Sequence, residues 1–163
     1  MGRRAIEAGP TSETVADNLA RFRRLRGLTL AELSARMTEV GRPMTGNTLS
    51  AIENRSRRAD VDDLVVLAAV LNVSPASLLM PYLDPSTKGE HGDPSLVHAT
   101  VPSSVFTEPV AAGRLWNWLN TSMPLDIPKY GDQVDSFEVE RWRRDQVPGF
   151  AWNTSHTATN TGE

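Results

Sequence analysis

The chain has 163 residues, 39% of them hydrophobic, with no cysteine and a formal net charge of −3 at pH 7. This length accommodates one ordinary domain with an appendage, or two small domains. The lack of cysteine excludes disulfides and thiolate metal sites, and no apolar run approaches the 18 residues of a membrane span. Because the first residues lead into no long hydrophobic stretch, we also expect no secretory signal and a cytoplasmic protein.

The charge is distributed unevenly along the chain. Residues 1–80 hold 11 Arg against 9 acidic residues, a balance of +2, whereas residues 81–163 hold 6 basic against 11 acidic residues, a balance of −5. This asymmetry indicates two segments with different partners. The basic excess of the first segment is too small to identify a nucleic-acid-binding protein by itself.

The first part of the chain contains two predicted helices. Residues 1–12 are small, charged and aperiodic, and we expect a flexible N-terminal arm there. Apolar residues then recur every three or four positions, which predicts an amphipathic helix from about Thr14 to near Gly27. Thr29 followed three residues later by Glu32 has the spacing of a capping box and predicts the start of a second helix.

Three more short helices are predicted before residue 82. Residues 38–44 contain a glycine and a proline and are expected to form a turn. Thr45 can cap the third helix, the fourth begins at Asp60 or Val61, and the Ser74-Pro75 pair begins a short fifth. Five short helices predict an all-α domain over residues 13–81.

The second half has a weaker pattern. Prolines and glycines interrupt residues 82–109, which we interpret as a linker. Residues 110–147 form a small, partly helical segment, with an apolar, Trp-bearing stretch followed by a helix from Asp135 to about Gln146. Neither helix can form a large core of its own, and residues 148–163 are expected to be a disordered tail.

The third predicted helix has the features of a helix that enters a DNA groove. Leu49 and Ile52 hold one narrow apolar face, so small and polar residues face outward: Gly46, Asn47, Ser50 and Ala51. Asparagine can make a bidentate contact with adenine, and an alanine methyl can touch a thymine methyl. The hydroxyls of Thr45 and Thr48 can reach a phosphate or a base edge. Taken alone, the same residues also fit an ordinary solvent-facing helix.

Arginines flank this helix. Arg55, Arg57 and Arg58 cluster on the expected loop after it, where they can hold backbone phosphates without reading sequence. The alternative is a solvated charged loop. Four further arginines, Arg21, Arg23, Arg24 and Arg26, are interpreted mainly as the exposed face of the first helix.

Several separated pieces of sequence carry a resemblance to a known family. They are Leu28-Thr29-Leu30-Ala31-Glu32-Leu33-Ser34, then Thr48-Leu49-Ser50-Ala51-Ile52-Glu53-Asn54, then Asp63-Leu64-Val65-Val66-Leu67-Ala68 with Leu71-Asn72-Val73-Ser74 and Leu78-Leu79. Residues 14–80 resemble a lambda-repressor-like, Cro-type (Xre-type) helix-turn-helix domain. The resemblance implies a five-helix bundle whose third helix reads DNA in the manner of a transcriptional regulator.

The resemblance also implies roles for individual residues. Gly46, Asn47, Ser50 and Ala51 would face the bases, with Thr45 at the helix start, and Glu53 would pack or cap the end of the helix. The complete set of predicted DNA-binding residues is Thr29, Arg42, Thr45, Gly46, Asn47, Thr48, Ser50, Ala51, Asn54, Arg55 and Arg57.

Two departures from the family pattern affect these expectations. The second helix often begins with a glutamine that braces a phosphate and the recognition helix, and Leu30 occupies that place here. The turn through Thr38 to Arg42 is about five residues longer than the compact form and resembles regulators of actinobacteria and their phages. The longer turn could change the angle of the third helix or place Arg42 on the DNA backbone.

The second half offers material for a partner interface. Trp116, Trp118 and Trp142 could anchor a protein contact, or they could pack this segment onto the helical bundle. Ala112-Gly113 matches the cleavage site of self-cleaving Ser/Lys repressors, but the roughly 50 residues that follow are too few for such a peptidase domain.

No catalytic or metal-ligating pattern is present. The three histidines, His91, His98 and His156, lack ligand spacing. We therefore expect no enzyme activity, no metal, no cofactor and no membrane association. The sequence is interpreted as a sequence-specific transcriptional regulator that binds double-stranded DNA as a homodimer, with repression favoured over activation. The alternative is a protein-interaction adaptor or antitoxin that uses residues 110–146.

Overall fold

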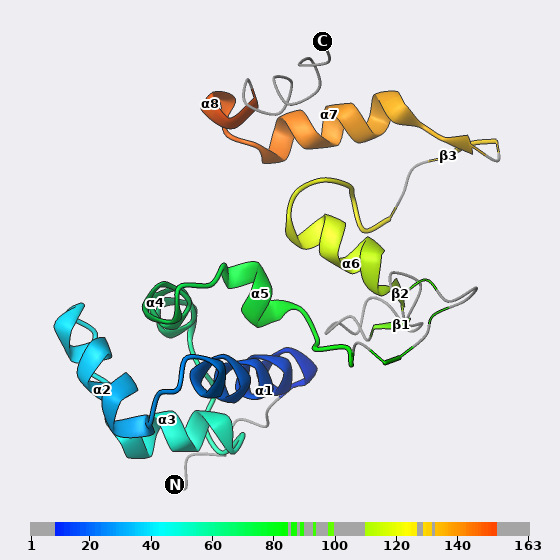
Figure 1. Ribbon diagram of the computed structural model, residues 1–163. Helices are drawn as coiled ribbons and strands as arrows, with labels where there is room; N and C mark the ends of the chain where they lie inside the picture. The colour runs from blue at the N-terminus through cyan, green and yellow to red at the C-terminus, as the bar shows by residue number, and fades with distance from the viewer. Residues whose placement is uncertain are drawn as a thin grey trace, which may run out of the picture.

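The computed structural model describes residues 9–84, 86–87, 89, 93, 98–99, 110–126, 129–131 and 133–152. Within these residues, five helices come first along the chain, followed by two short strand pairs and three further helices (Figure 1). The helices are α1 (Pro10–Leu25), α2 (Leu30–Glu39), α3 (Gly46–Glu53), α4 (Val61–Leu71), α5 (Pro75–Leu79), α6 (Ala112–Leu119), α7 (Ser136–Gln146) and α8 (Gly149–Trp152). The strands are β1 (His98–Ala99), paired antiparallel with β2 (Val110–Ala111), and β3 (Lys129–Tyr130), paired antiparallel with β4 (Gln133–Val134).

Side-chain caps start helices α2 to α5. Thr29 and Glu32 form the predicted capping box at α2. Thr45 and Ser74 cap α3 and α5, as predicted, and Asp60 caps α4. Each cap accepts a hydrogen bond from a backbone N–H that has no partner within its helix, so these helix starts follow from the local sequence.

Helix α1 begins at Pro10, earlier than the predicted start near Thr14. Proline is favourable at the first helical position, because the N–H that it lacks would have no partner there. Residues 10–12 of the predicted flexible arm are therefore helical. Residues 1–8 lie outside the described part of the chain.

The turn between α2 and α3 contains a glycine in the left-handed region, just after the C-cap residue Val40. Gly41 has φ 79°; its N–H donates to the Thr38 carbonyl at 3.0 Å, and the Arg42 N–H donates to the Met37 carbonyl at 3.0 Å. This is a Schellman motif, which glycine forms at little steric cost. Helix α2 consequently runs to Glu39, and the turn starts two residues later than the sequence predicts.

The core of the N-terminal bundle is formed by apolar side chains from α1 to α5. Its fully buried members include Leu19, Leu33, Met37, Leu49, Ile52, Leu67, Leu71 and Leu78. Burial of this apolar surface is the main force that holds five short helices together. The predicted all-α class and five-helix bundle are confirmed.

A second, smaller core lies in the C-terminal half. Val110, Ala112, Leu115 and Leu125 are buried together, with Met80 and Leu83 packed against them. Because Met80 and Leu83 directly follow α5, this core joins the end of the bundle. Residues 82–109, predicted as a linker, thus contribute Leu83 to a core and β1 to a strand pair, and most of the others lie outside the described residues.

The last helices are more exposed than the rest. Helix α7 agrees with the predicted helix over this segment, and none of its residues is buried. The prediction of a disordered tail over residues 148–163 is wrong for Gly149–Trp152, which form α8. A helix of four residues is too short to show helical periodicity in the sequence, and residues 153–163 lie outside the described part. Among the described residues, no helix has the length and apolar character needed to span a membrane.

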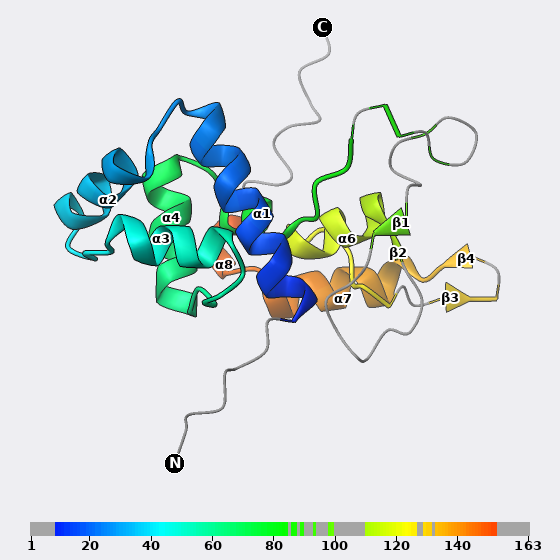
Figure 2. The same cartoon turned by 90° about the horizontal axis from the view of Figure 1, so that it is seen from below.

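Helix α3 lies on the face of the bundle that points away from the C-terminal segment. In Figure 1, α3 is at the lower edge of the bundle, whereas α6, α7 and α8 lie above α5. Figure 2, turned by 90°, shows α3 beside α1 at the front, with α7 passing behind α1. The described part of the second half therefore leaves α3 uncovered.

Candidate DNA-binding surface

Helix α3 is held in the bundle by two side chains and leaves the opposite face free. Leu49 and Ile52 are buried in the core. Asn47 lies on the exposed side, and its side chain forms no hydrogen bond with any described residue. Partly exposed residues surround it: Gly46, Thr48, Ser50 and Ala51. This face can approach a major groove with its donors and acceptors available.

The start of α3 is built from a threonine cap and a close helix contact. The Thr45 hydroxyl accepts from the Thr48 N–H at 3.1 Å, and the two threonine hydroxyls lie 3.0 Å apart. A Cβ added at Gly46 would lie 3.8 Å from the Leu30 Cβ. The first turns of α2 and α3 therefore lie together, with the exposed Thr29 cap beside them. Leu30 itself packs against the core and provides no polar contact at this place.

The end of α3 is fixed by an ion pair. Arg23 of α1 donates to the two carboxylate oxygens of Glu53 at 2.6 and 2.8 Å, and these side chains are only 13% and 9% exposed. The hydrogen bond from Arg23 to Glu53 raises the pKa of the guanidinium above its usual value. Arg23 also donates to the Leu28 carbonyl at 2.8 Å. Glu53 thus has the structural role that the resemblance implied.

Of the four arginines interpreted mainly as an exposed face, Arg24 and Arg26 are exposed, whereas Arg21 and Arg23 are partly buried. Besides the mostly buried Arg23, Arg26 donates to the Leu71 and Asn72 carbonyls at 3.0 and 3.2 Å. The guanidinium of Arg21 stacks on the rings of Phe22 and Tyr82, at 4.0 and 4.7 Å from their centroids. Apart from Phe22, which is the next residue of α1, these partners are distant in sequence or come from loops, so helical periodicity gave no sign of them.

The arginines after α3 are paired with carboxylates. Arg55 donates to both oxygens of Asp17 on α1, at 2.8 and 2.9 Å, and Arg57 donates to Asp63 at 3.2 Å. The hydrogen bond to Asp17 raises the pKa of Arg55 above its usual value. Both side chains remain nearly half exposed. Arg58 is exposed and has no ion pair with a described residue. Asn54, which caps the end of α3, donates to the Ser50 hydroxyl at 3.1 Å.

Arg42 lies in the extended turn and is directed toward α4. It donates to Asp63 at 2.9 and 3.1 Å and to Asp60 at 3.2 Å. The hydrogen bond to Asp63 raises the pKa of the Arg42 guanidinium above its usual value. The structure thus shows Arg42 in an acidic cluster, whereas the sequence suggested a place on the DNA backbone. Asp60 is predicted only as a possible start of the fourth helix and Asp63 only as part of the family motif, so this contact was missed.

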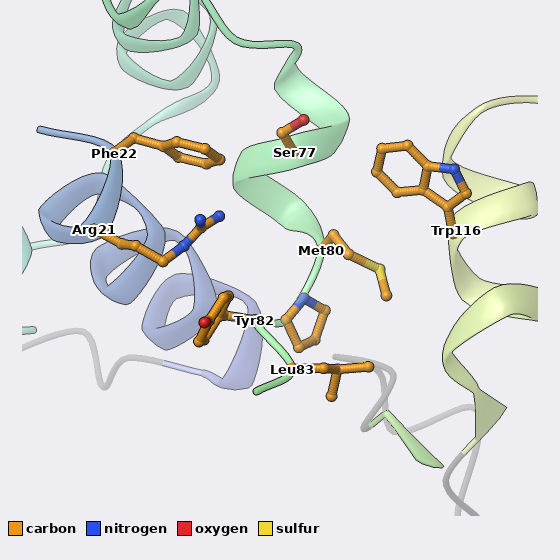
Figure 3. Close-up of a pocket in the computed structure, with 8 residues that line it drawn as sticks. Arg21, Phe22, Ser77, Met80, Tyr82, Leu83 and Trp116 are labelled. Carbon is orange, nitrogen blue, oxygen red and sulfur yellow. The ribbon is translucent and has the colours of Figure 1, made fainter. Parts of the chain in front are cut away.

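A cleft of about 190 Å³ separates the bundle from α6 (Figure 3). Arg21 lies between Phe22 and Tyr82 on one side, and Trp116 points toward Met80 from the other. Trp116 and Trp118 are 42% and 38% exposed, so each is only partly used in packing. Trp142 lines a separate cleft with Pro124 and Asp126. These positions agree in part with internal packing, whereas a role in a partner interface stays a prediction.

The architecture is that of a DNA-binding helix-turn-helix protein: a five-helix bundle that presents its third helix, polar side outward, at an uncovered face. Comparison with known families agrees, because residues 19–78 match the family described as Helix-turn-helix. Residues 19–78 are thus similar to the lambda-repressor-like, Cro-type helix-turn-helix family, and this match supports a DNA-binding transcription regulator. The family is one of DNA-binding regulators and not of enzymes. No curated protein and no solved structure matches the chain.

Proposed function

We propose that the protein is a sequence-specific transcriptional repressor that binds a short pseudo-palindromic operator as a homodimer. The observation that carries this proposal is the uncovered face of α3 around Asn47. Asn47 would read an adenine, with Ser50 and Ala51 beside it, and the threonines at the helix start would contact backbone or base edges. This function requires access to chromosomal DNA, which agrees with the expected cytoplasmic location.

The affinity in this proposal has two parts. Arg55, Arg57 and Thr29 would hold phosphates on either side of α3. This contribution to affinity decreases as the salt concentration rises, because the release of counterions from the DNA then becomes less favourable. Asn47 and its neighbours would add discrimination between sequences. A phosphate would compete with Asp17 for Arg55, whereas the half-exposed Arg57 would add a phosphate while it keeps its hydrogen bond to Asp63.

Selection of bound duplexes from a random pool tests the proposal. A homodimer should recover a motif with two-fold symmetry and half-sites about one helical turn apart. Transcription in a purified system should then fall when that motif overlaps the promoter. Recovery of a motif whose occupancy raises transcription would replace repression by activation, and recovery of no motif would contradict sequence-specific binding.

Asn47→Ala is the sharpest single change. It should cost about 1–3 kcal/mol on the recovered operator and little on random DNA, because only a base contact is lost. Asn117→Ala on α6 is the matched control, since it makes the same chemical change on the other side of the molecule. Equal losses on both DNAs with Asn47→Ala would show that this residue reads no base.

A second candidate function is a protein-interaction adaptor or antitoxin that uses residues 110–146. The partly exposed Trp116 and Trp118 favour it, because tryptophans commonly anchor protein contacts. A partner retained by the full chain and lost with Trp118→Ala, together with no mobility shift on genomic DNA, would support this function over the repressor.

A further inference from the structure

Asp63 joins three parts of the bundle through one buried carboxylate. Its side chain belongs to α4 and is among the few buried polar groups of the described residues, at 1% exposure. One oxygen accepts from Arg42 at 2.9 and 3.1 Å, and the other accepts from Arg57 at 3.2 Å and from the Asp60 N–H at 3.4 Å. Both oxygens are thus engaged, as a buried carboxylate requires.

The two arginines lie on opposite flanks of α3. Arg42 is in the turn before it, four residues ahead of Gly46, and Arg57 is in the loop after it, four residues beyond Glu53. Asp63 therefore ties both connections of α3 to one point at the start of α4. Arg42 reaches this point because the Schellman motif at Gly41 ends α2 and directs the chain back toward α4.

The extended turn creates the need for such a tie. A longer connection gives α3 more freedom of orientation, since the loop-closure constraint weakens as the loop lengthens. Leu30 supplies no polar brace between α2 and α3. Leu49 and Ile52 hold α3 against the core, and the Arg23–Glu53 ion pair fixes the end of α3 to α1. The hydrogen bonds of Asp63 add directional, charge-assisted restraint at both connections of α3, toward α4.

We propose that Asp63 is a positioning residue for base reading, which sets the orientation of α3 through Arg42 and Arg57. This inference rests on the proposed sequence-specific function of α3. It assigns Arg42 to a brace instead of to a phosphate. Without the hydrogen bonds from Arg42 and Arg57 to Asp63, α3 can adopt several orientations in the groove. Discrimination between operator and random DNA then falls, while non-specific binding to phosphates is retained.

Binding of Asp63→Asn, Arg42→Ala and their double variant to the recovered operator and to a random duplex, over a range of salt, tests the proposal. Asparagine at position 63 keeps the size of the side chain and an oxygen that can accept from the Asp60 N–H. Each single variant should lower the ratio of operator to random-duplex affinity at least about fivefold, the lower end of one base contact. The double variant should lower this affinity ratio no further than the more affected single variant, because both substitutions break the same contact.

Arg58→Ala is the matched control, since Arg58 lies in the same region without an ion pair to a described residue. If Arg58 contacts a phosphate, its loss should weaken binding to both DNAs alike. The slope of log affinity against log salt concentration should then become shallower by about 0.9, the value for one phosphate. Arg42→Ala should leave this slope unchanged. The same shallower slope with Arg42→Ala, or an unchanged affinity ratio with folded Asp63→Asn, would overturn the proposal.

Amide hydrogen exchange without DNA separates this proposal from the function on which it rests. Asp63→Asn and Arg42→Ala should each speed exchange in residues 40–53 more than in α1 and α5, whereas Arg58→Ala should not. If the wild type recovers no motif, the proposed function fails, and unchanged exchange in residues 40–53 would independently overturn the brace. If Asp63→Asn does not fold, Arg42→Ala decides both measurements, because Asp63 then keeps Arg57.

Discussion

Arg55 is a non-glycine residue in the left-handed region, with φ 62°, at the point where α3 ends. Its N–H donates to the Ile52 carbonyl at 2.9 Å, and the Ser56 N–H donates to the Ala51 carbonyl at 2.9 Å, which is the Schellman arrangement. An L residue other than glycine pays about 1–2 kcal/mol for this conformation. From this conformation the Arg55 side chain contacts Asp17. The unfavourable backbone conformation therefore places a guanidinium beside the proposed DNA-binding surface.

Replacing Arg55 by glycine should separate stability from DNA binding. Glycine relieves the backbone cost, but the exposed ion pair is lost and the unfolded chain gains freedom, so we expect the free energy of unfolding to change by less than about 1 kcal/mol. Affinity for operator and random duplex should fall together, with a shallower salt dependence. Urea unfolding and binding titrations measure the two effects, and a large loss of stability with unchanged DNA affinity would show that Arg55 is only structural.

Glu53 illustrates the opposite case, a charged residue whose role lies inside the bundle. Glu53→Gln leaves the mostly buried Arg23 without its carboxylate, and breaking such a pair costs about 3–5 kcal/mol. Urea unfolding followed by far-ultraviolet circular dichroism should show this loss. Glu39→Gln, at an exposed position of α2, is the control and should change stability by less than about 0.5 kcal/mol. A loss below about 1 kcal/mol for Glu53→Gln would contradict the bracing role of this pair.

At the scale of elements, the start of α2 couples a helix cap to pH. The Glu32 carboxylate accepts from the Thr29 backbone N–H at 2.7 Å and from its hydroxyl at 2.7 Å. These hydrogen bonds lower the pKa of Glu32 below its ordinary value of 4.5. A carboxyl whose pKa is lower in the folded state stabilises the fold above its unfolded pKa. This stabilisation is lost as the pH falls through the folded pKa.

Thr29→Ala should therefore have two measurable effects. Loss of the cap should cost about 1 kcal/mol at neutral pH, and the fall in stability below pH 4.5 should become less steep, because the Thr29 hydroxyl no longer favours ionised Glu32. Thermal unfolding from pH 3 to pH 7 checks both, with Thr29→Ser as the conservative control that retains the hydroxyl. An unchanged pH profile in Thr29→Ala would show that the hydroxyl contributes little to the capping box.

How far the sequence predicts an element depends on whether its determinants are local. The caps at Thr29, Thr45 and Ser74 and the apolar stripe of α4 lie within single helices, and these helices were predicted closely. The Arg42–Asp63 contact joins residues 21 positions apart, and residue spacing contains no information on it. The strand pairs were missed because two residues cannot show alternation. Among the site residues, exposure agrees with the prediction at Asn47, whereas base contact there remains a prediction.

At the scale of the whole molecule, the protein has two cores of unequal size that share the segment after α5. The bundle is held by side chains from five helices, whereas the second core has only Val110, Ala112, Leu115 and Leu125 as buried members. All four tryptophans lie between residues 116 and 152. Tryptophan fluorescence therefore reports mainly the C-terminal half, while far-ultraviolet circular dichroism reports mainly the helices of the bundle.

Leu115→Ala should loosen the C-terminal half and leave the DNA-binding bundle in place. Leu115 is 1% exposed in the smaller core, and such truncations cost about 2–5 kcal/mol, more than a core of this size can absorb. The fluorescence transition in urea should move to lower concentration and separate from the circular dichroism transition, with random-duplex affinity unchanged because α3 is far from α6. Leu67→Ala in the bundle core should instead move both transitions and abolish DNA binding. Coincident shifts of the two signals in Leu115→Ala would mean that both cores unfold as one cooperative unit, and the C-terminal half would then be part of what holds α3 in its reading position.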